Sequence, residues 1–287
     1  MTEPEYKAVV FAGGGSRCAW QVGFWTEAAP ALNLAPRTVV GVSAGASMAA
    51  LLLAGRAEFA LSYMKKAMAA NSRNIYPLNV LSGKPIFPHF EIYKRAVIDC
   101  IDRTALARLH QGPDLKIVLS RPPAWLGPRL AVALGFSCYL LERKIKYPVH
   151  PRLAGKVGFA AEAVRARDCR TPEDLAELLI ASSCTPPLTP VMKWNGGAAL
   201  DGGLVDNVPV AVLEPDASPA LVLLTRRFPE KSIPKVPGRR YVQPSTPIAA
   251  SKWDYTDPQG LQRAFDLGRR DGEAFARSHG RPGGAMK

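Results

Sequence analysis

The strongest constraint on the fold is segment 38–50, where a short apolar run enters an alanine-rich run through a turn of small residues. The apolar run predicts a buried strand, and the alanine-rich run predicts a helix. The turn, G-V-S-A-G at 41–45, has the G-x-S-x-G spacing of a nucleophile elbow. Such a turn strains its central residue, Ser43, and requires small neighbours such as Gly41 and Gly45. Ser43 would then project at a helix N-terminus, where free amides favour negative charge. The alternative is a tight turn without chemistry.

A second strand, turn and helix lie upstream of the first. Residues 6–12 are apolar and rich in strand-forming side chains, and a helical pattern begins at Cys18. Consecutive glycines between them leave backbone N–H groups uncovered, and such groups can close on an oxyanion or a phosphate. A dinucleotide-binding turn is the alternative, but position 18 is not the glycine that G-x-G-x-x-G requires, and the next strand ends without an acidic residue for a ribose. The loop consists of Gly13, Gly14, Gly15, Ser16 and Arg17.

A third feature is a carboxylate that follows a short apolar strand. Asp201 ends the run 199–201, and Gly202 and Gly203 come directly after it. Glycines at these positions let the backbone turn sharply and let another element approach closely. An ordinary turn aspartate is the alternative interpretation.

In this order, the three features resemble the patatin-like phospholipase family, whose pattern is a glycine-rich oxyanion loop, then G-x-S-x-G, then D-G-G or D-G-A far downstream. Segments 181–190, 204–209 and 242–245 also fit, so the resemblance covers about 6–250. The chain departs from the family at Cys18, where a glycine is usual, and at Leu188, where an aromatic residue is frequent. The resemblance implies a three-layer α/β/α fold with a mostly parallel central sheet, in a single domain over 1–287.

The resemblance also implies a function, namely a serine acyl hydrolase acting on phospholipid, lysophospholipid or a similar lipid ester. Ser43 would be the nucleophile and Asp201 its base, forming a Ser-Asp dyad without a metal or an organic cofactor. The oxyanion loop would be Gly13, Gly14, Gly15, Ser16 and Arg17, the elbow glycines Gly41 and Gly45, and the glycines of the base motif Gly202 and Gly203.

The positions of the histidines favour a dyad over a histidine-dependent triad. An α/β-hydrolase triad follows the order Ser, Asp or Glu, His. Of the four histidines, only His279 follows Asp201, and it lies in a polar C-terminal segment. Ser43 also follows only two predicted strands, too few for an α/β-hydrolase elbow. Three other functions stay open: a carboxylesterase for short acyl esters, a nucleotide-binding module that uses the glycine loop, and a lipid-binding protein that has lost catalysis.

Composition bounds the class of protein. With 287 residues and 47% hydrophobic side chains, the chain can form one large α/β domain. Five cysteines are scattered without C-x-x-C spacing, which favours free thiols in a reducing compartment over disulfides or a metal site. Because no leader-like or membrane-spanning apolar run is present in the sequence, we expect a soluble cytoplasmic protein.

The chain is basic, with a formal net charge of +13. Its Lys and Arg residues are dispersed and no nucleic-acid motif accompanies them, so nucleic acid is not an expected partner. The excess charge predicts peripheral contact with an anionic membrane surface. A well-solvated basic surface is the alternative.

The remaining pattern predicts alternating helices and strands, and hence a mostly parallel sheet between helical layers. Segments 74–87 and 228–247 are rich in proline, glycine or arginine and are expected to be irregular. Segment 129–143 fits a strand pair, a core helix or part of a lid over an acyl pocket. Further helices are expected at 57–71, 89–100, 104–110, 171–182 and 258–278, and further strands at 115–119 and 221–225.

Overall fold

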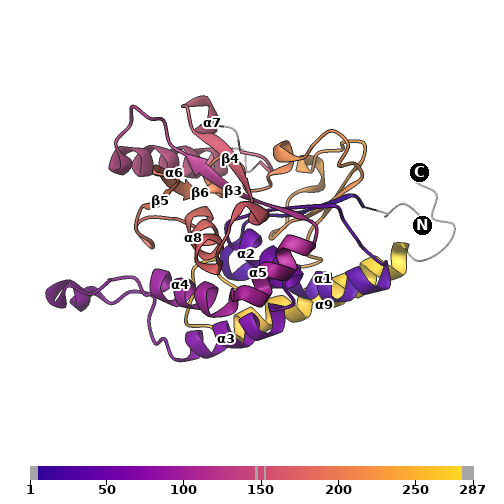
Figure 1. Ribbon diagram of the computed structural model, residues 1–287, viewed down its shortest axis with the longest axis horizontal. Coiled ribbons are helices and arrows are strands. Elements are labelled where there is room, and N and C mark those ends of the chain that lie inside the picture. Colours follow the sequence, from indigo (N-terminus) through magenta and orange to yellow (C-terminus); the bar gives the residue numbers. More distant parts are fainter. Residues whose placement is uncertain (1–5, 146–147, 152, 280–287) are drawn as a thin grey trace.

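The computed structural model describes residues 6–145, 148–151 and 153–279. A central eight-stranded sheet carries helices on both faces (Figure 1). The strand order is β5-β6-β3-β2-β1-β7-β8, and β4 also pairs with β3. Pairing is parallel from β3 to β8 and antiparallel for β4, β5 and β6. The strands are β1 Ala8–Phe11, β2 Thr38–Val42, β3 Asp114–Arg121, β4 Ala160–Arg165, β5 Met192–Trp194, β6 Gly197–Asp201, β7 Ala220–Leu223 and β8 Arg239–Val242.

The inner strands are buried on both faces, which explains their uninterrupted apolar sequences. In β1, Val9 and Phe11 join the larger hydrophobic core, and Val10 joins a smaller core of valines on the opposite face. β7 divides in the same way between Leu221 and Val222. The sheet is therefore enclosed on both sides, and within the described structure segments 208–213 and 228–233, not an α-helix, complete the smaller core.

Most helices cover the face of the larger core, below the sheet in Figure 1. The opposite face near β6 is covered by α6 and α7, because Leu200 packs with these helices while its neighbour Ala199 belongs to the larger core. The helices are α1 Ala19–Ala31, α2 Ala44–Leu53, α3 Ala57–Ala69, α4 His89–Cys100, α5 Arg103–Gln111, α6 Pro128–Ile145, α7 Leu153–Lys156, α8 Pro172–Ser182 and α9 Pro258–His279.

Helix α9 lies along α1, and glycines let the two backbones approach closely (Figure 1). A Cβ atom on Gly268 would lie 2.0 Å from the carbonyl oxygen of Trp20. The Trp20 indole also donates a hydrogen bond of 2.7 Å to Asp271. Phe275 belongs to the larger core, so the core continues well past residue 250.

One edge of β3 is shared by two strands, and this arrangement positions the candidate site. β4 pairs with residues 116–121 of β3, β2 with residues 114–118, and β6 with Leu119 and Ser120. β4 pairs with residues of β3 that also pair with β2 and with β6, so β4 occupies one edge of β3. β2 and β6 therefore lie one after the other along the other edge. β2 is parallel to β3 and β6 is antiparallel, so their carboxyl ends meet head to head.

Several expectations for individual elements are met. The helix after Thr171 begins with a capping box in which the Thr171 hydroxyl accepts from the Asp174 amide and the Asp174 carboxylate accepts from the Thr171 amide. Segment 129–143, for which three interpretations were open, lies within helix α6. Within the described ranges, no helix is both long and apolar enough to cross a membrane.

Other expectations were incomplete. β4, β5 and β8 were not predicted, because they are short or half-exposed and lack an alternating apolar pattern. β8 lies within the segment 228–247 that was expected to be irregular, and the predicted loop 74–87 contains a 3-10 helix, η2 Pro77–Ser82. Pairing of β4 with β3, of β5 with β6 and of β8 with β7 supplies the order that local sequence does not specify.

Candidate active site

Ser43 lies between β2 and α2 in strained backbone, with φ 55° and ψ −140°. A non-glycine residue with positive φ costs about 1–3 kcal/mol, and such strain persists only where the surroundings enforce it. Tight packing enforces it here. A Cβ atom on Gly41 would lie 2.5 Å from Ala46 Cα, and one on Gly45 would lie 2.4 Å from the Ala12 carbonyl oxygen.

Asp201 ends β6 and faces Ser43 directly. The Ser43 hydroxyl donates to Asp201 Oδ2 at 2.6 Å, and both side chains are buried. The Thr185 hydroxyl donates to the same oxygen at 3.1 Å, and the Gly203 amide donates to Oδ1 at 2.7 Å. The carboxylate is therefore oriented by two further donors while it accepts from the serine, and it is placed to receive the serine proton.

Glycine is required at both positions that follow Asp201. A Cβ atom on Gly202 would lie 2.4 Å from the Val118 carbonyl oxygen, and one on Gly203 would lie 2.8 Å from Asn207 Oδ1. The two glycines thus let the backbone after Asp201 pass close to β3 and to the Asn207 side chain.

Two buried serines that the sequence did not single out hold the pair in place. Ser182 Oγ accepts from the Ser43 amide at 2.9 Å and donates to the Val118 carbonyl at 2.6 Å. Ser120 Oγ donates to the Asp201 carbonyl at 2.9 Å. Ser182 and Thr185 both lie in segment 181–190, whose small polar residues were the available signal.

The glycine loop follows β1 at the carboxyl edge of the parallel strands, next to Ser43, and is anchored there by side chains after β6 and β7. The Gly13 carbonyl accepts from Asn207 Nδ2 at 2.9 Å and from Thr225 Oγ1 at 2.6 Å, and the Gly13 amide donates to the Asn207 carbonyl at 3.0 Å. The Ser16 amide donates to the Lys252 carbonyl at 3.3 Å. Two amides of the loop are thus engaged by the protein's own carbonyls.

The backbone amides of Gly14 and Gly15 differ from those of Gly13 and Ser16. Among the hydrogen bonds of the described residues, none uses either amide as its donor. Gly15 has φ +58°, and a Cβ atom there would lie 2.2 Å from the Lys252 carbonyl oxygen, so only glycine fits. Among the five residues predicted to form the oxyanion loop, Gly14 and Gly15 therefore have backbone N–H groups that can donate to a bound oxyanion.

Arg17 and Cys18 follow the loop within the 3-10 helix η1 Gly15–Cys18. Arg17 Nε lies 3.5 Å from the Gly14 carbonyl, so its side chain folds back on the loop. The Cys18 thiol donates to the Ala12 carbonyl at 3.6 Å, and burial raises its pKa to about 12. Cys18 is therefore a neutral thiol at physiological pH and does not compete with Ser43 as a nucleophile.

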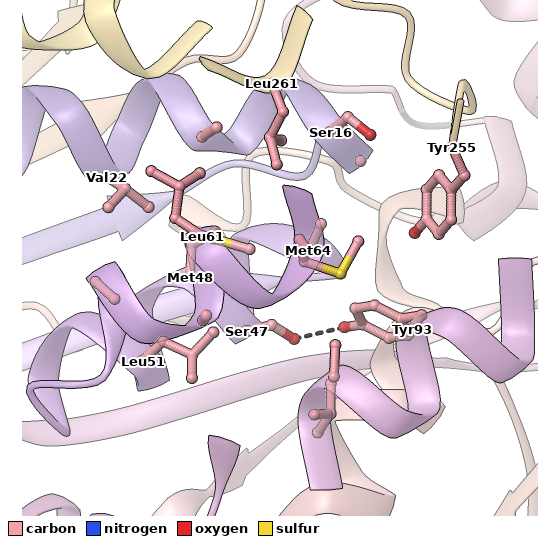
Figure 2. A pocket seen from close by; sticks show the side chains of 17 residues that line it. Ser16, Val22, Ser47, Met48, Leu51, Leu61, Met64, Tyr93, Tyr255 and Leu261 are labelled. Carbon is pink, nitrogen blue, oxygen red and sulfur yellow. Dashed lines mark hydrogen bonds between the residues drawn. The ribbon is translucent and has the colours of Figure 1, made fainter. Parts of the chain in front are cut away.

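An apolar pocket begins beside Ser43, where Ala44, Gly15 and Ser16 contribute to its lining. Figure 2 shows the hydroxyl groups of Ser16, Tyr93 and Tyr255 toward one end and the side chains of Val22, Leu51 and Leu61 toward the other. The pocket thus has a polar end and an apolar end. The rest of its lining consists of Ala19, Ser47, Met48, Ala57, Ala60, Met64, Ala96, Val97 and Leu261.

The polar end contains a hydroxyl network and one unsatisfied hydroxyl. Tyr93 Oη shares hydrogen bonds with Ser47 Oγ at 2.5 Å and with Ser183 Oγ at 2.9 Å (Figure 2). Burial raises the pKa of Tyr93 to about 12, which keeps its hydroxyl protonated. The Ser16 hydroxyl is buried and makes no hydrogen bond within the described part of the chain. It is thus available to a bound molecule.

The four histidines all have hydrogen-bond partners away from the Ser43–Asp201 pair. His89 hydrogen-bonds the Trp253 carbonyl, and His110 hydrogen-bonds the Cys169 carbonyl. His150 hydrogen-bonds the Asp206 carboxylate and the Tyr241 hydroxyl. His279 bonds Ser278 and stacks on Phe275 at the end of α9. Outside the gaps at 146–147 and 152 and the two chain ends, no group of three or more His, Cys, Asp or Glu could hold a metal ion.

Fold and site together define an α/β protein with a serine elbow, a facing aspartate and a glycine loop. A sequence model of the patatin-like phospholipase family matches residues 9–214, which include all three. The chain belongs to this family of lipid hydrolases, as the sequence resemblance predicted. The crystal structure of VipD from Legionella pneumophila aligns with a TM-score of 0.47 and 13% identity, covering 96% of this chain and 67% of that one. A search of curated proteins finds no match.

Proposed function

We propose that the protein is a serine acyl hydrolase that cleaves lipid esters through a dyad of Ser43 and Asp201. The observation that carries the proposal is the 2.6 Å hydrogen bond from the Ser43 hydroxyl to Asp201 at a strained elbow. A serine hydroxyl needs a base to take its proton before it attacks a carbonyl. Asp201 is the group in position to do so, because no histidine contacts Ser43 in the described structure.

In the proposed reaction, Ser43 Oγ attacks the ester carbonyl while its proton passes to Asp201. The tetrahedral intermediate collapses to an acyl-serine, and Asp201 returns the proton to the departing alcohol. A water molecule then gives a proton to Asp201 and attacks the acyl-serine. The second collapse releases the fatty acid, and the proton on Asp201 returns to Ser43 Oγ.

Oxyanion stabilisation is assigned to the amides of Gly14 and Gly15. Within the described structure these two amides donate to no acceptor, whereas those of Gly13 and Ser16 already donate to carbonyls. Donors fixed in advance toward a developing oxyanion contribute strongly, and losing one typically lowers the rate by about 10²–10³-fold. The fold supplies this rigidity, because Asn207 and Thr225 hold the loop at Gly13.

The lining of the pocket suits an ester group joined to an alkyl chain. Its polar end borders Ala44 and the glycine loop, where the reacting carbonyl would lie, and aliphatic side chains line its far end. The buried Ser16 hydroxyl is free to hydrogen-bond an ester oxygen at the polar end. This order of polar and apolar groups supports an acyl ester as the substrate.

Labelling with a fluorophosphonate tests the dyad. We expect an adduct on Ser43 in the parent protein, no adduct in Ser43→Ala, and a loss of turnover of about 10³-fold or more in Asp201→Asn with the fold retained. Ser278→Ala and Asp266→Asn, which alter remote residues on α9, serve as matched controls and should behave as the parent does. An adduct mainly on Ser182 or Ser183, or full activity in Asp201→Asn, would refute the dyad.

A series of esters of increasing acyl length tests the role of the pocket. The parent should prefer long chains, and Ala60→Phe, which fills a lining position on α3, should shift the preference to short chains. We expect kcat/KM for the longest ester to fall by about tenfold or more, because each methylene excluded from an apolar site forfeits about 0.8 kcal/mol. A parent that prefers short esters would instead support the general carboxylesterase.

A further inference from the structure

A loop between α3 and α4 projects away from the body of the protein and is here called the finger (residues 72–88). Figure 1 shows it as the purple segment that extends farthest to the left, with the 3-10 helix η2 at its tip. The finger has internal order. The Tyr76 amide donates to the Ile86 carbonyl at 2.8 Å, and the Asn79 side chain donates to the Pro85 carbonyl at 2.8 Å.

The tip of this ordered loop presents large apolar side chains to solvent. Leu78 is 78% exposed, Val80 64% and Leu81 83%, and Ile75 is 51% exposed. Four of the exposed large hydrophobic residues in the described structure thus fall within seven consecutive positions. Single exposed apolar residues are common on protein surfaces, but a contiguous group marks a site of interaction.

The charges around the finger indicate which surface it contacts. Between Asn71 and Phe90 the sequence contains no acidic residue, and Arg73 and Lys84 are exposed on the two sides of the tip. Aliphatic side chains flanked by cations are complementary to a bilayer with anionic head groups, since the cations remain among the head groups while the apolar groups enter the acyl region.

The base of the finger is tied to the proposed substrate pocket. Asn71 donates to the Tyr255 carbonyl at 2.9 Å, and the Tyr255 amide donates to Asn74 at 2.8 Å. Tyr255 lines the pocket, and so do residues of both helices that the finger connects, among them Met64 of α3 and Tyr93 of α4. The finger therefore connects its apolar tip directly to the elements that form the pocket.

We propose that the finger inserts Leu78, Val80 and Leu81 into the interfacial region of an anionic phospholipid membrane and so brings the pocket to its lipid substrate. This inference rests on the proposed lipid-ester function for its purpose, but membrane binding by the finger is measurable without any catalysis. The finger does not line the pocket, so its apolar tip should be dispensable for soluble esters.

Vesicle sedimentation tests the proposal, with vesicles of phosphatidylglycerol and phosphatidylcholine in equal parts. The test variant is the double substitution Leu78→Ser with Leu81→Ser. The matched control is Ile98→Ser with Val236→Ser, which removes two exposed aliphatic side chains outside the finger. We expect the finger variant to bind about tenfold to hundredfold more weakly than the parent, as the burial of two leucines implies, and the control to bind normally.

Hydrolysis of a soluble short-chain ester and the oligomeric state are measured on the same proteins. Parental soluble-ester activity in the finger variant, together with lost vesicle binding, supports the proposal. Equal vesicle binding by parent and finger variant, absent binding by the parent, or equal loss in the control would overturn it. If the parent is a dimer and the finger variant a monomer with unchanged vesicle binding, the finger would instead be a contact with a second copy of the chain. Finger-dependent vesicle binding by a parent that hydrolyses no ester would refute the proposed function and leave the docking surface intact.

Discussion

At the scale of single residues, the candidate site depends on a few buried polar contacts around Asp201. Its carboxylate accepts three hydrogen bonds, from Ser43, Thr185 and Gly203. Buried polar networks of this kind are rigid when every member is satisfied and fail when one partner is removed. Thr185 is the one side chain besides Ser43 that donates to the carboxylate in the described structure, which makes it the sharpest test of positioning.

We therefore predict that Thr185→Val lowers kcat by about tenfold to hundredfold, because a hydrogen bond to a charged group contributes about 1.5–3 kcal/mol. Thr185→Ser should retain most of the activity, since it keeps the hydroxyl. Thr26→Val, which removes an exposed helix hydroxyl, is the control. Steady-state kinetics and thermal unfolding separate positioning from loss of fold. A kcat unchanged in Thr185→Val would mean that Asp201 does not need this donor.

At the scale of elements, the contact between α1 and α9 holds the N-terminal half of the chain against its C-terminal helix. The two helices approach closely because Gly23, Gly268 and Gly272 face the backbone of the opposite helix. α1 follows the glycine loop directly, and so a shift of α1 would displace the amides of Gly14 and Gly15. The interface is thus linked to the candidate site through η1 and α1.

Gly268→Ala should destabilise the protein by about 1–3 kcal/mol, the usual range for an overpacked core. The added Cβ would meet the Trp20 carbonyl, a backbone atom that has no rotamer with which to move away. Gly155→Ala is the matched control, because no atom lies within 4 Å of the added Cβ and alanine is the better helix former. Urea denaturation of both variants measures the difference. Equal midpoints would show that the helices separate at little cost.

At the scale of the whole molecule, the net charge of +13 sets how the protein meets a charged surface. The described ion pairs lie mostly at the surface, and because each joins one base to one acid, they leave the net basic excess unchanged. Long-range attraction to an anionic bilayer is screened over about 10 Å at 0.1 M salt, whereas insertion of apolar side chains is not. The two contributions to membrane binding can therefore be separated by ionic strength.

We predict that the parent binds anionic vesicles more strongly than phosphatidylcholine vesicles, and that the preference decreases as salt is raised. Co-sedimentation at low and high salt with both kinds of vesicle measures this. The Leu78→Ser and Leu81→Ser variant should show weaker binding at every salt concentration but a similar dependence on salt. Equal binding to both kinds of vesicle, insensitive to salt, would indicate that the charge serves solubility.

Local sequence was sufficient for the elements that carry their own pattern. The apolar runs before Gly13 and Ser43 encode buried strands, and Thr171 with Asp174 encodes a helix start, because these signals act over a few residues. The turn residues at 41–45 likewise specify a tight strand-to-helix turn. The membership of the patatin-like phospholipase family also followed from sequence alone, since its motifs keep their order.

The family resemblance predicted that Ser43 and Asp201 would pair, but only the tertiary structure shows how the chain brings them together. Ser43 and Asp201 are 158 positions apart, and they come together because β2 and β6 end head to head on one edge of β3. No local preference specifies that junction, since β6 pairs with only two residues of β3. The same holds for Ser182, Thr185 and Asn207, whose roles depend on partners from other strands. Local propensity acts over neighbouring residues, whereas the site is assembled by long-range pairing and burial, which the complete sheet determines.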